Sequence, residues 1–210
     1  TRDEFVELHN LSPAPEVLFD PLNRTNTWRL RGAVDFNFPT NVTLAAGGYL
    51  LAVSFDPATN PLVRAAFEAK YGSNLLLVGP YLGRLDNGGG SVELEKPDAP
   101  QTIPGPEFGF VPYIRVDRVK YSDAVPWPMA ADGVGASLQR VDVAAYGNEP
   151  TNWFAASFTP GTSHLTNPPP LVAITSPAAG ATWVAPVNIN ITALAADPGG
   201  AVSKVEFYAD

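Results

Sequence analysis

Hydrophobic and polar residues alternate along short segments of this chain, which is the pattern of strands that bury one face. The clearest segments are Glu4–His9, Trp28–Arg31 and Asp35–Phe38, and each is followed closely by Asn, Gly or Pro. Tyr49–Phe55 is almost continuously apolar instead, so we expect a central strand that is covered on both faces. Many short strands between turn residues predict an all-β fold.

The middle of the chain carries a hairpin signal. Leu75–Val78 and Leu82–Leu85 precede Asp86–Gly90, whose glycines and Asn-Gly pair are typical of a hairpin turn into a strand at Ser91–Glu95. Lys96–Tyr113 is rich in proline and predicts a loop.

The stretch Ile114–Arg140 completes the pattern of a small antiparallel sandwich. Its first strand alternates with one slip, as edge or bulged strands often do. Pro126-Trp127-Pro128 cannot lie inside a sheet, because proline lacks the N–H that the sheet needs. A glycine turn at Asp132–Gly135 then leads into a strand from Ser137, and Asn152–Phe158 is the last strand of this domain.

One segment has a helical period instead. In Pro61–Tyr71, Leu62 and Ala66 are four residues apart, as are Val63 and Phe67. Proline in the first turn and Gly72 after the last residue are typical helix boundaries. We therefore expect one short helix inserted among the strands.

Composition and charge narrow the classes of partner. The formal net charge is −8 and no region is basic, so the phosphate backbone of a nucleic acid has no favourable partner here. The absence of cysteine excludes disulfides and thiolate zinc sites. No run is long and apolar enough for membrane insertion. Thr1 is not a natural start, so we expect a fragment or a mature segment.

Three consecutive prolines, Pro168–Pro170, predict a stiff spacer between two domains. We expect a β-sandwich over residues 1–165, a linker over 166–170 and the first strands of a second domain over 171–210. The expected strands of that second part are Leu171–Thr175, Val187–Ala193 and Val202–Tyr208.

A series of motifs runs through about residues 3–165. In chain order they are EFVELHN, TWRLRG, FNFPTNVTLAAGGYLLAV, LGRLDNGGGSVELEKPD, VDRVKYSD, PWP, ADGVG, SLQR and NWFAASFTPGTSH. In these motifs the first domain resembles a bacterial lamin tail domain, an immunoglobulin-like sandwich found in nuclear lamins and in many secreted bacterial proteins. Two departures from the family pattern are the long connection Leu11–Thr27 and the helix-like insert.

The C-terminal part, through ITSPAAGAT, VNINITALAAD and VSKVEFYAD, resembles the opening of a bacterial immunoglobulin-like domain. Related modules often carry an aspartate in the loop where Asp197 stands, sometimes near calcium, so Asp197 is a candidate calcium ligand. Together the two resemblances imply an immunoglobulin-like β-sandwich of the lamin tail type with one inserted helix, followed by a partial second immunoglobulin-like domain.

Few residues are candidates for catalysis. His9 and His164 are the only histidines, and neither has a nucleophile or an orienting partner at a useful spacing. We expect His9 to make an ordinary surface or loop contact. Glu93 and Glu95 share one strand face and could imitate the carboxylate pair of a glycosidase, although a solvated acidic face is the simpler interpretation.

The aromatic residues offer a second possibility. Trp28 and Trp153 match family positions that pack inside, so we expect both to be buried and Trp127, between two prolines, to be less so. Trp127 and Tyr113 are then the candidate ligand-binding residues of a carbohydrate-binding module, the alternative function.

The favoured function is a non-catalytic extracellular module for spacing, docking or adhesion within a larger secreted or cell-surface bacterial protein. Its expected partners are other domains of the same polypeptide, cell-surface proteins or glycans. Apart from the possible calcium ion, no cofactor is expected.

Overall fold

The computed structural model describes residues 3–133, 135–163, 171–196 and 204–207. The chain divides into two compact units, Thr1–Thr162 and Ser163–Asp210. In chain order the elements of the first unit are β1 Phe5–His9, β2 Glu16–Val17, β3 Arg29–Gly32, β4 Val34–Asn37, β5 Thr43–Leu44, β6 Tyr49–Val53, α1 Pro61–Tyr71, β7 Leu77–Val78, β8 Leu82–Gly83, β9 Gly89–Pro97, β10 Tyr113–Ser122, the 3-10 turn Met129–Ala131, β11 Ser137–Arg140, the 3-10 turn Pro150–Asn152 and β12 Trp153–Ala156.

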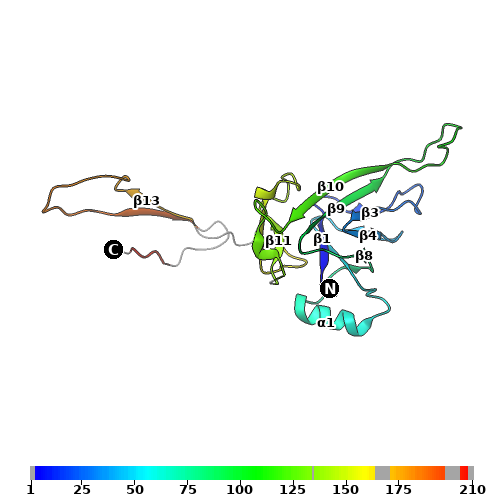
Figure 1. Cartoon of the computed structure of the whole chain (residues 1–210), viewed down its shortest axis with the longest axis horizontal. Coiled ribbons are helices and arrows are strands. Elements are labelled where there is room, and N and C mark those ends of the chain that lie inside the picture. The colour runs from blue at the N-terminus through cyan, green and yellow to red at the C-terminus, as the bar shows by residue number, and fades with distance from the viewer. Residues whose placement is uncertain (1–2, 134, 164–170, 197–203, 208–210) are drawn as a thin grey trace. The chain divides into compact units, whose positions relative to one another are not determined.

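Two sheets form the centre of the first unit. One has the order β1-β6-β7 and the other β10-β9-β3-β4-β8, while β2 pairs with β5 and β11 pairs with β12. The all-β, immunoglobulin-like fold class with one short helix is confirmed. Figure 1 shows β1 between α1 on one side and β9 and β10 on the other.

Strand β6 is buried on both faces, as its continuous apolar sequence predicts. Leu50 and Ala52 point into a cluster shared with the five-stranded sheet, through residues such as Leu30 and Val34. Leu51 and Val53 point the opposite way, into a second cluster on the helix side. Because neighbouring residues of a strand face opposite sides, one strand supplies both cores.

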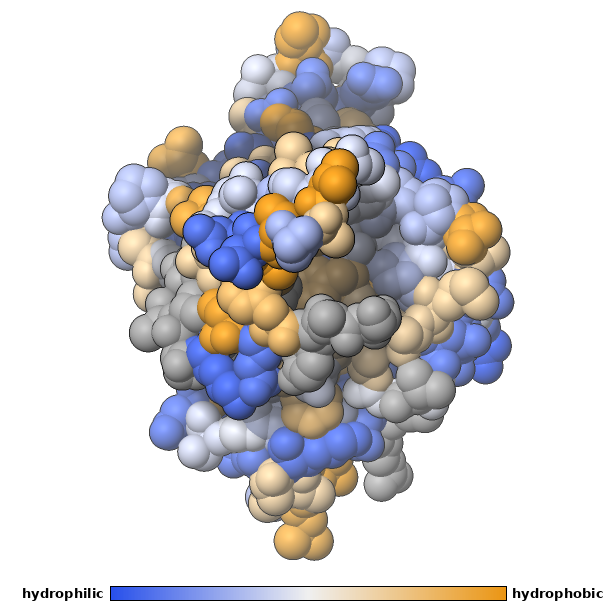
Figure 2. Space-filling model, turned by 90° about the vertical axis from the view of Figure 1, so that its left-hand side faces the viewer, coloured by the Kyte–Doolittle hydropathy of each residue, from blue (hydrophilic) through white to orange (hydrophobic). Residues whose placement is uncertain are grey.

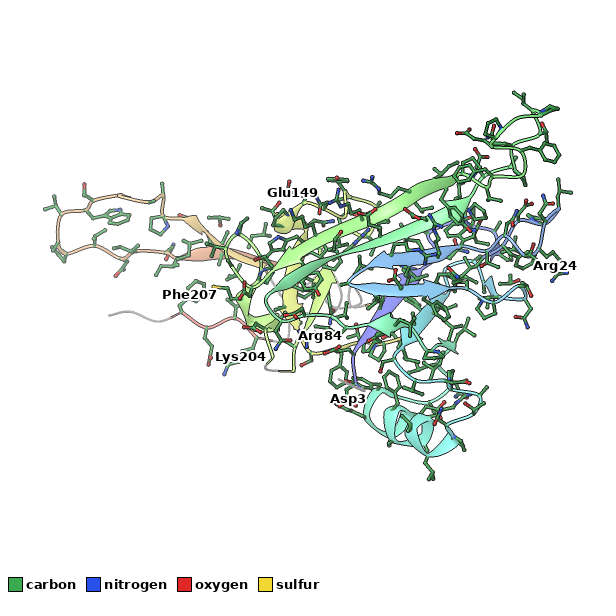
Figure 3. All side chains as sticks on the ribbon, turned by 45° about the vertical axis from the view of Figure 1, so that its right-hand side comes forward. Asp3, Arg24, Arg84, Glu149, Lys204 and Phe207 are labelled. Atoms are coloured by element: carbon green, nitrogen blue, oxygen red, sulfur yellow. The ribbon has the colours of Figure 1, made fainter. Side chains whose placement is uncertain are left out.

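The predicted helix is confirmed with the same bounds, Pro61–Tyr71. Phe67 is its buried residue, and its ring meets the rings of Phe5 and Phe55 at centroid distances of 6.0 and 5.6 Å. The helix ends at Gly72, whose φ of 106° is open to glycine but costly for other residues. Lys70 in the last turn contacts Asp3 at 2.8 Å, and Figure 3 shows Asp3 beside the helix.

The predicted hairpin at Asp86–Gly90 is wrong. Strand β8 pairs with β4, whereas β9 pairs with β3 and β10. The turn itself forms, since the Gly88 N–H donates to the Asp86 carboxylate at 3.2 Å. However, a local turn does not determine which strands pair with each other. The side chains of β9 pack into the core beside β3, and the short, exposed β8 offers no comparable burial.

The true hairpin joins β9 and β10 through the loop of residues 98–112. The broken alternation predicts an edge or a bulged strand. Strand β10 is both, because it lies at the edge of its sheet and its register slips between Arg115 and Asp117. In Figure 1 the two strands run outward together and end in this loop, away from the rest of the first unit.

In the second unit, β13 Leu171–Ser176 pairs antiparallel with β14 Thr192–Ala196. The first predicted strand is confirmed, but only the last two residues of Val187–Ala193 lie in β14. Of the predicted strand Val202–Tyr208, residues 204–207 form no strand and the others lie outside the described residues. Apolar side chains such as Ile189, Ile191 and Phe207 are about half exposed. Among the described residues, two strands alone offer no opposing layer that would bury them.

Candidate functional site

The tryptophans are buried in the reverse of the predicted order. Trp127 is only 7% exposed, whereas Trp28 and Trp153 are half-buried. The prolines hold Trp127 in a turn, closed by its N–H to the Ala124 carbonyl at 3.0 Å, and its ring packs on Trp153 at 6.1 Å. Flanking prolines thus exclude Trp127 from a strand without exposing its ring.

The structure places Trp127 and Tyr113 in different clusters. The Arg29 guanidinium covers one face of the Tyr113 ring at 3.4 Å from its centroid, and the Tyr113 hydroxyl donates to the Thr27 carbonyl. A sugar platform needs an open ring face. Burial of Trp127 therefore removes one of the two residues that support the carbohydrate-binding alternative, and Arg29 covers one ring face of the other, Tyr113.

Glu93 and Glu95 are held in ion pairs across the sheet. Glu95 contacts Arg29 at 2.6 Å, while Glu93 contacts Arg115 and Arg118 at 3.3 Å each. Both carboxylates are largely covered, so the interpretation as a solvated acidic face is wrong. Arginines on β3 and β10 form ion pairs with both carboxylates. Glu93 and Glu95 are therefore not available as the acid and base pair that glycoside hydrolysis needs.

The remaining candidates are the two histidines and Asp197. Asp197 and His164 lie outside the described residues. His9 stacks on Tyr49, with ring centroids 4.1 Å apart, and burial lowers the pKa of its imidazole. No group of three or more His, Asp or Glu side chains that could hold a metal ion occurs in the described ranges.

Glu7 is a partly buried carboxylate that the sequence pattern does not reveal. Its carboxylate accepts the Gly161 N–H at 2.6 Å, which ties the end of the first unit to β1. Burial raises the pKa of Glu7 to about 6, against the opposing effect of this hydrogen bond. Gly161 also lines an open hollow of about 670 Å³ between residues 47–49, 71–76 and 159–162. Glu7 lies in a strand with an alternating pattern, and nothing in that pattern indicates that a segment more than 150 residues away covers its side chain.

We predict that Glu7→Gln stabilises the protein at neutral pH. The folded state holds the Glu7 proton more tightly than the unfolded state, so stability rises as pH falls from above about 6 to below about 4.5. The neutral amide removes the cost of a partly buried charge, and the gain should be about 1–2 kcal/mol near pH 7.5, after allowance for partial exposure. Urea unfolding near pH 7.5 and pH 4 measures it, and the difference from wild type should vanish at the lower pH.

Glu107→Gln, in an exposed loop, is the matched control and should leave stability unchanged at both pH values. A less stable Glu7→Gln protein at pH 7.5 would mean that the hydrogen bond from Gly161 outweighs the cost of burial.

The loop at the end of the β9–β10 hairpin carries three large apolar side chains that are exposed to solvent. Ile103, Phe108 and Phe110 are 76%, 66% and 59% exposed. We call residues 98–112 the hairpin tip. Figure 3 shows this loop carrying its side chains outward, away from the sheets.

The hairpin tip is an ordered loop. The Gln101 N–H donates to the Phe110 carbonyl at 2.8 Å, and the Gly109 N–H donates to the Gln101 carbonyl at 2.8 Å. A further bond of 2.9 Å runs from the Asp98 N–H to the Pro112 carbonyl and closes the base of the loop. These bonds give the loop a defined backbone conformation, in which its three large apolar side chains lie in solvent.

Single exposed apolar residues are ordinary on protein surfaces, whereas clusters of them mark contact sites. In the view of Figure 2, apolar residues appear in several patches between hydrophilic ones. The sequence predicts the tip only as a proline-rich loop. The signal that could have identified it is the presence of three large apolar residues where loops usually carry polar ones.

The second unit matches a known protein family. A family model described as a bacterial Ig domain matches residues 170–210, so this segment is similar to a bacterial immunoglobulin-like domain. Such domains are typically non-catalytic parts of larger proteins. No curated protein and no solved structure matches the chain. Among the described residues, no helix combines the length and apolar character of a membrane span.

Proposed function

We propose that this chain is a non-catalytic interaction module of a larger, extracytoplasmic bacterial protein, and that the hairpin tip is its contact surface. The observation that carries the proposal is the ordered exposure of Ile103, Phe108 and Phe110. Leaving three large apolar side chains in water forgoes roughly 1.5–3 kcal/mol of burial for each of them. A partner that covers them recovers this free energy.

The first domain is, in this proposal, of the lamin tail type, over residues 1–165. Support comes from the order of its motifs and from the two-sheet core around β6. Residues 166–170 act as the spacer and 171–210 as the start of the immunoglobulin-like domain. In bacterial proteins that the first domain resembles, catalytic domains often lie beside it, so any enzymatic step belongs to residues outside this chain. The acidic charge of −8 supports a partner other than nucleic acid.

The test compares two variants in a pull-down from the extracytoplasmic proteins of the source organism. Phe108→Ser combined with Phe110→Ser should abolish capture of specific proteins, because it removes apolar surface from the tip. Leu62→Ser on α1 changes a residue that is 85% exposed but lies apart from the tip, and it should capture the same proteins as wild type. Equal capture by wild type and the double variant would reject the hairpin tip as the contact surface.

A further inference from the structure

We infer that the hairpin tip inserts into an apolar pocket with a basic rim on a folded protein domain, an inference that rests on the proposed function. The tip places two aromatic rings two residues apart, on either side of Gly109. Gly109 has a φ of 83°, which favours glycine, and its N–H donates to the Gln101 carbonyl across the loop. Backbone geometry therefore fixes the spacing of the two positions that carry the rings before any partner binds.

Preorganisation makes the tip suited to insertion. Pro100, Pro104, Pro106 and Pro112 restrict the backbone, and the cross-loop hydrogen bonds restrict it further. A partner then loses little free energy to ordering the loop, and the burial of Phe108 and Phe110 contributes to affinity.

The same prolines argue against recognition by strand addition. An added strand pairs with a row of backbone N–H groups, and proline has none. Gly109 and Phe110 already donate their N–H groups within the chain, to Gln101 and to Glu107. A partner at this tip must therefore recognise side chains, which requires a pocket and not a sheet edge.

The negative charge of the hairpin tip distinguishes between the partner surfaces that could bury its apolar side chains. Residues 98–112 contain Asp98 and Glu107 and no Lys or Arg. An anionic lipid surface would repel these carboxylates, and a second copy of the tip would bring like charges together. A pocket with Lys or Arg at its rim complements both carboxylates while the rings fill its interior.

The experiment uses the whole chain with benzoylphenylalanine in place of Phe108, irradiated with the extracytoplasmic proteins of the source organism. The cross-linked protein is identified, purified and titrated calorimetrically with the wild-type chain and with variants. Phe108→Ser with Phe110→Ser should weaken binding on the order of 100-fold. Glu107→Lys should weaken it roughly fivefold at low salt, and that difference should shrink in about 0.5 M NaCl.

Two further variants distinguish binding that depends on the loop conformation from non-specific hydrophobic binding. Gly109→Ala adds a methyl group that meets no atom within 4 Å, so it acts through backbone strain and should weaken binding on the order of tenfold. Leu62→Ser should bind like wild type. Unchanged binding of Gly109→Ala would contradict insertion of a preformed loop.

The outcomes distinguish the two proposals. If the double Phe variant loses binding but Glu107→Lys binds as tightly as wild type, the hairpin tip remains the contact surface and the basic-rimmed pocket is wrong. An adduct formed only with a second copy of the chain, or tip-dependent binding to phosphatidylcholine and phosphatidylglycerol vesicles instead of a protein, also overturns the pocket. If the double variant binds like wild type, or if no adduct forms at position 108, both proposals fail.

Discussion

Trp127→Ala should lower the free energy of unfolding of the first unit by about 3–5 kcal/mol, the usual cost of truncating a buried aromatic side chain. Trp127 is 7% exposed and packs on Trp153, whose indole N–H donates to the Gly147 carbonyl at 2.8 Å. Arg140 lies over the Trp153 ring and pairs with Asp117 of β10. Removing Trp127 therefore leaves a void beside a group of contacts that joins β10, β11 and β12.

Denaturant unfolding measures this change, with Trp183→Ala as the matched control. Trp183 lies in the second unit and is 46% exposed, so its removal should change the stability of the first unit by less than about 0.5 kcal/mol. A Trp127→Ala protein as stable as wild type would contradict burial. It would also restore Trp127 as a candidate ring for binding sugars.

Leu50→Ala and Leu51→Ala should each cost the first unit about 2–5 kcal/mol, although the two side chains point in opposite directions. Both are fully buried, Leu50 between the two sheets and Leu51 on the side of α1. A strand with one solvent face would give one large effect and one small effect. Two large effects at adjacent positions are the expected result of a strand between two cores.

Leu62→Ala on α1 is the control, because this side chain is 85% exposed and should change stability by less than about 0.5 kcal/mol. Equilibrium urea unfolding of the three variants tests the arrangement of layers directly. A small effect of Leu51→Ala would mean that α1 does not form a tight second layer over the β1-β6-β7 sheet.

Local patterns determined the elements of the first unit that depend on neighbours in sequence. The bounds of α1 follow from the helical period, the proline at its start and Gly72 at its end. Burial of β6 on both faces follows from its apolar run, and the bulge in β10 follows from its broken alternation. Each of these features leaves a pattern in the order of neighbouring side chains, so the sequence alone predicts it.

Tertiary structure decided which strands pair, which rings are buried and which carboxylates are neutralised. The turn at Asp86–Gly90 forms locally, but β9 pairs with β3 because both pack into the same core. Glu7 is covered near Gly161, and Glu95 meets Arg29, across 154 and 66 positions of sequence. The cover over one ring or carboxylate and its charge partner depend on such distant neighbours, and a local pattern does not identify those neighbours. The hairpin tip illustrates the same limit, because its apolar residues could equally have folded inward, and only the path of β9 and β10 places them in solvent.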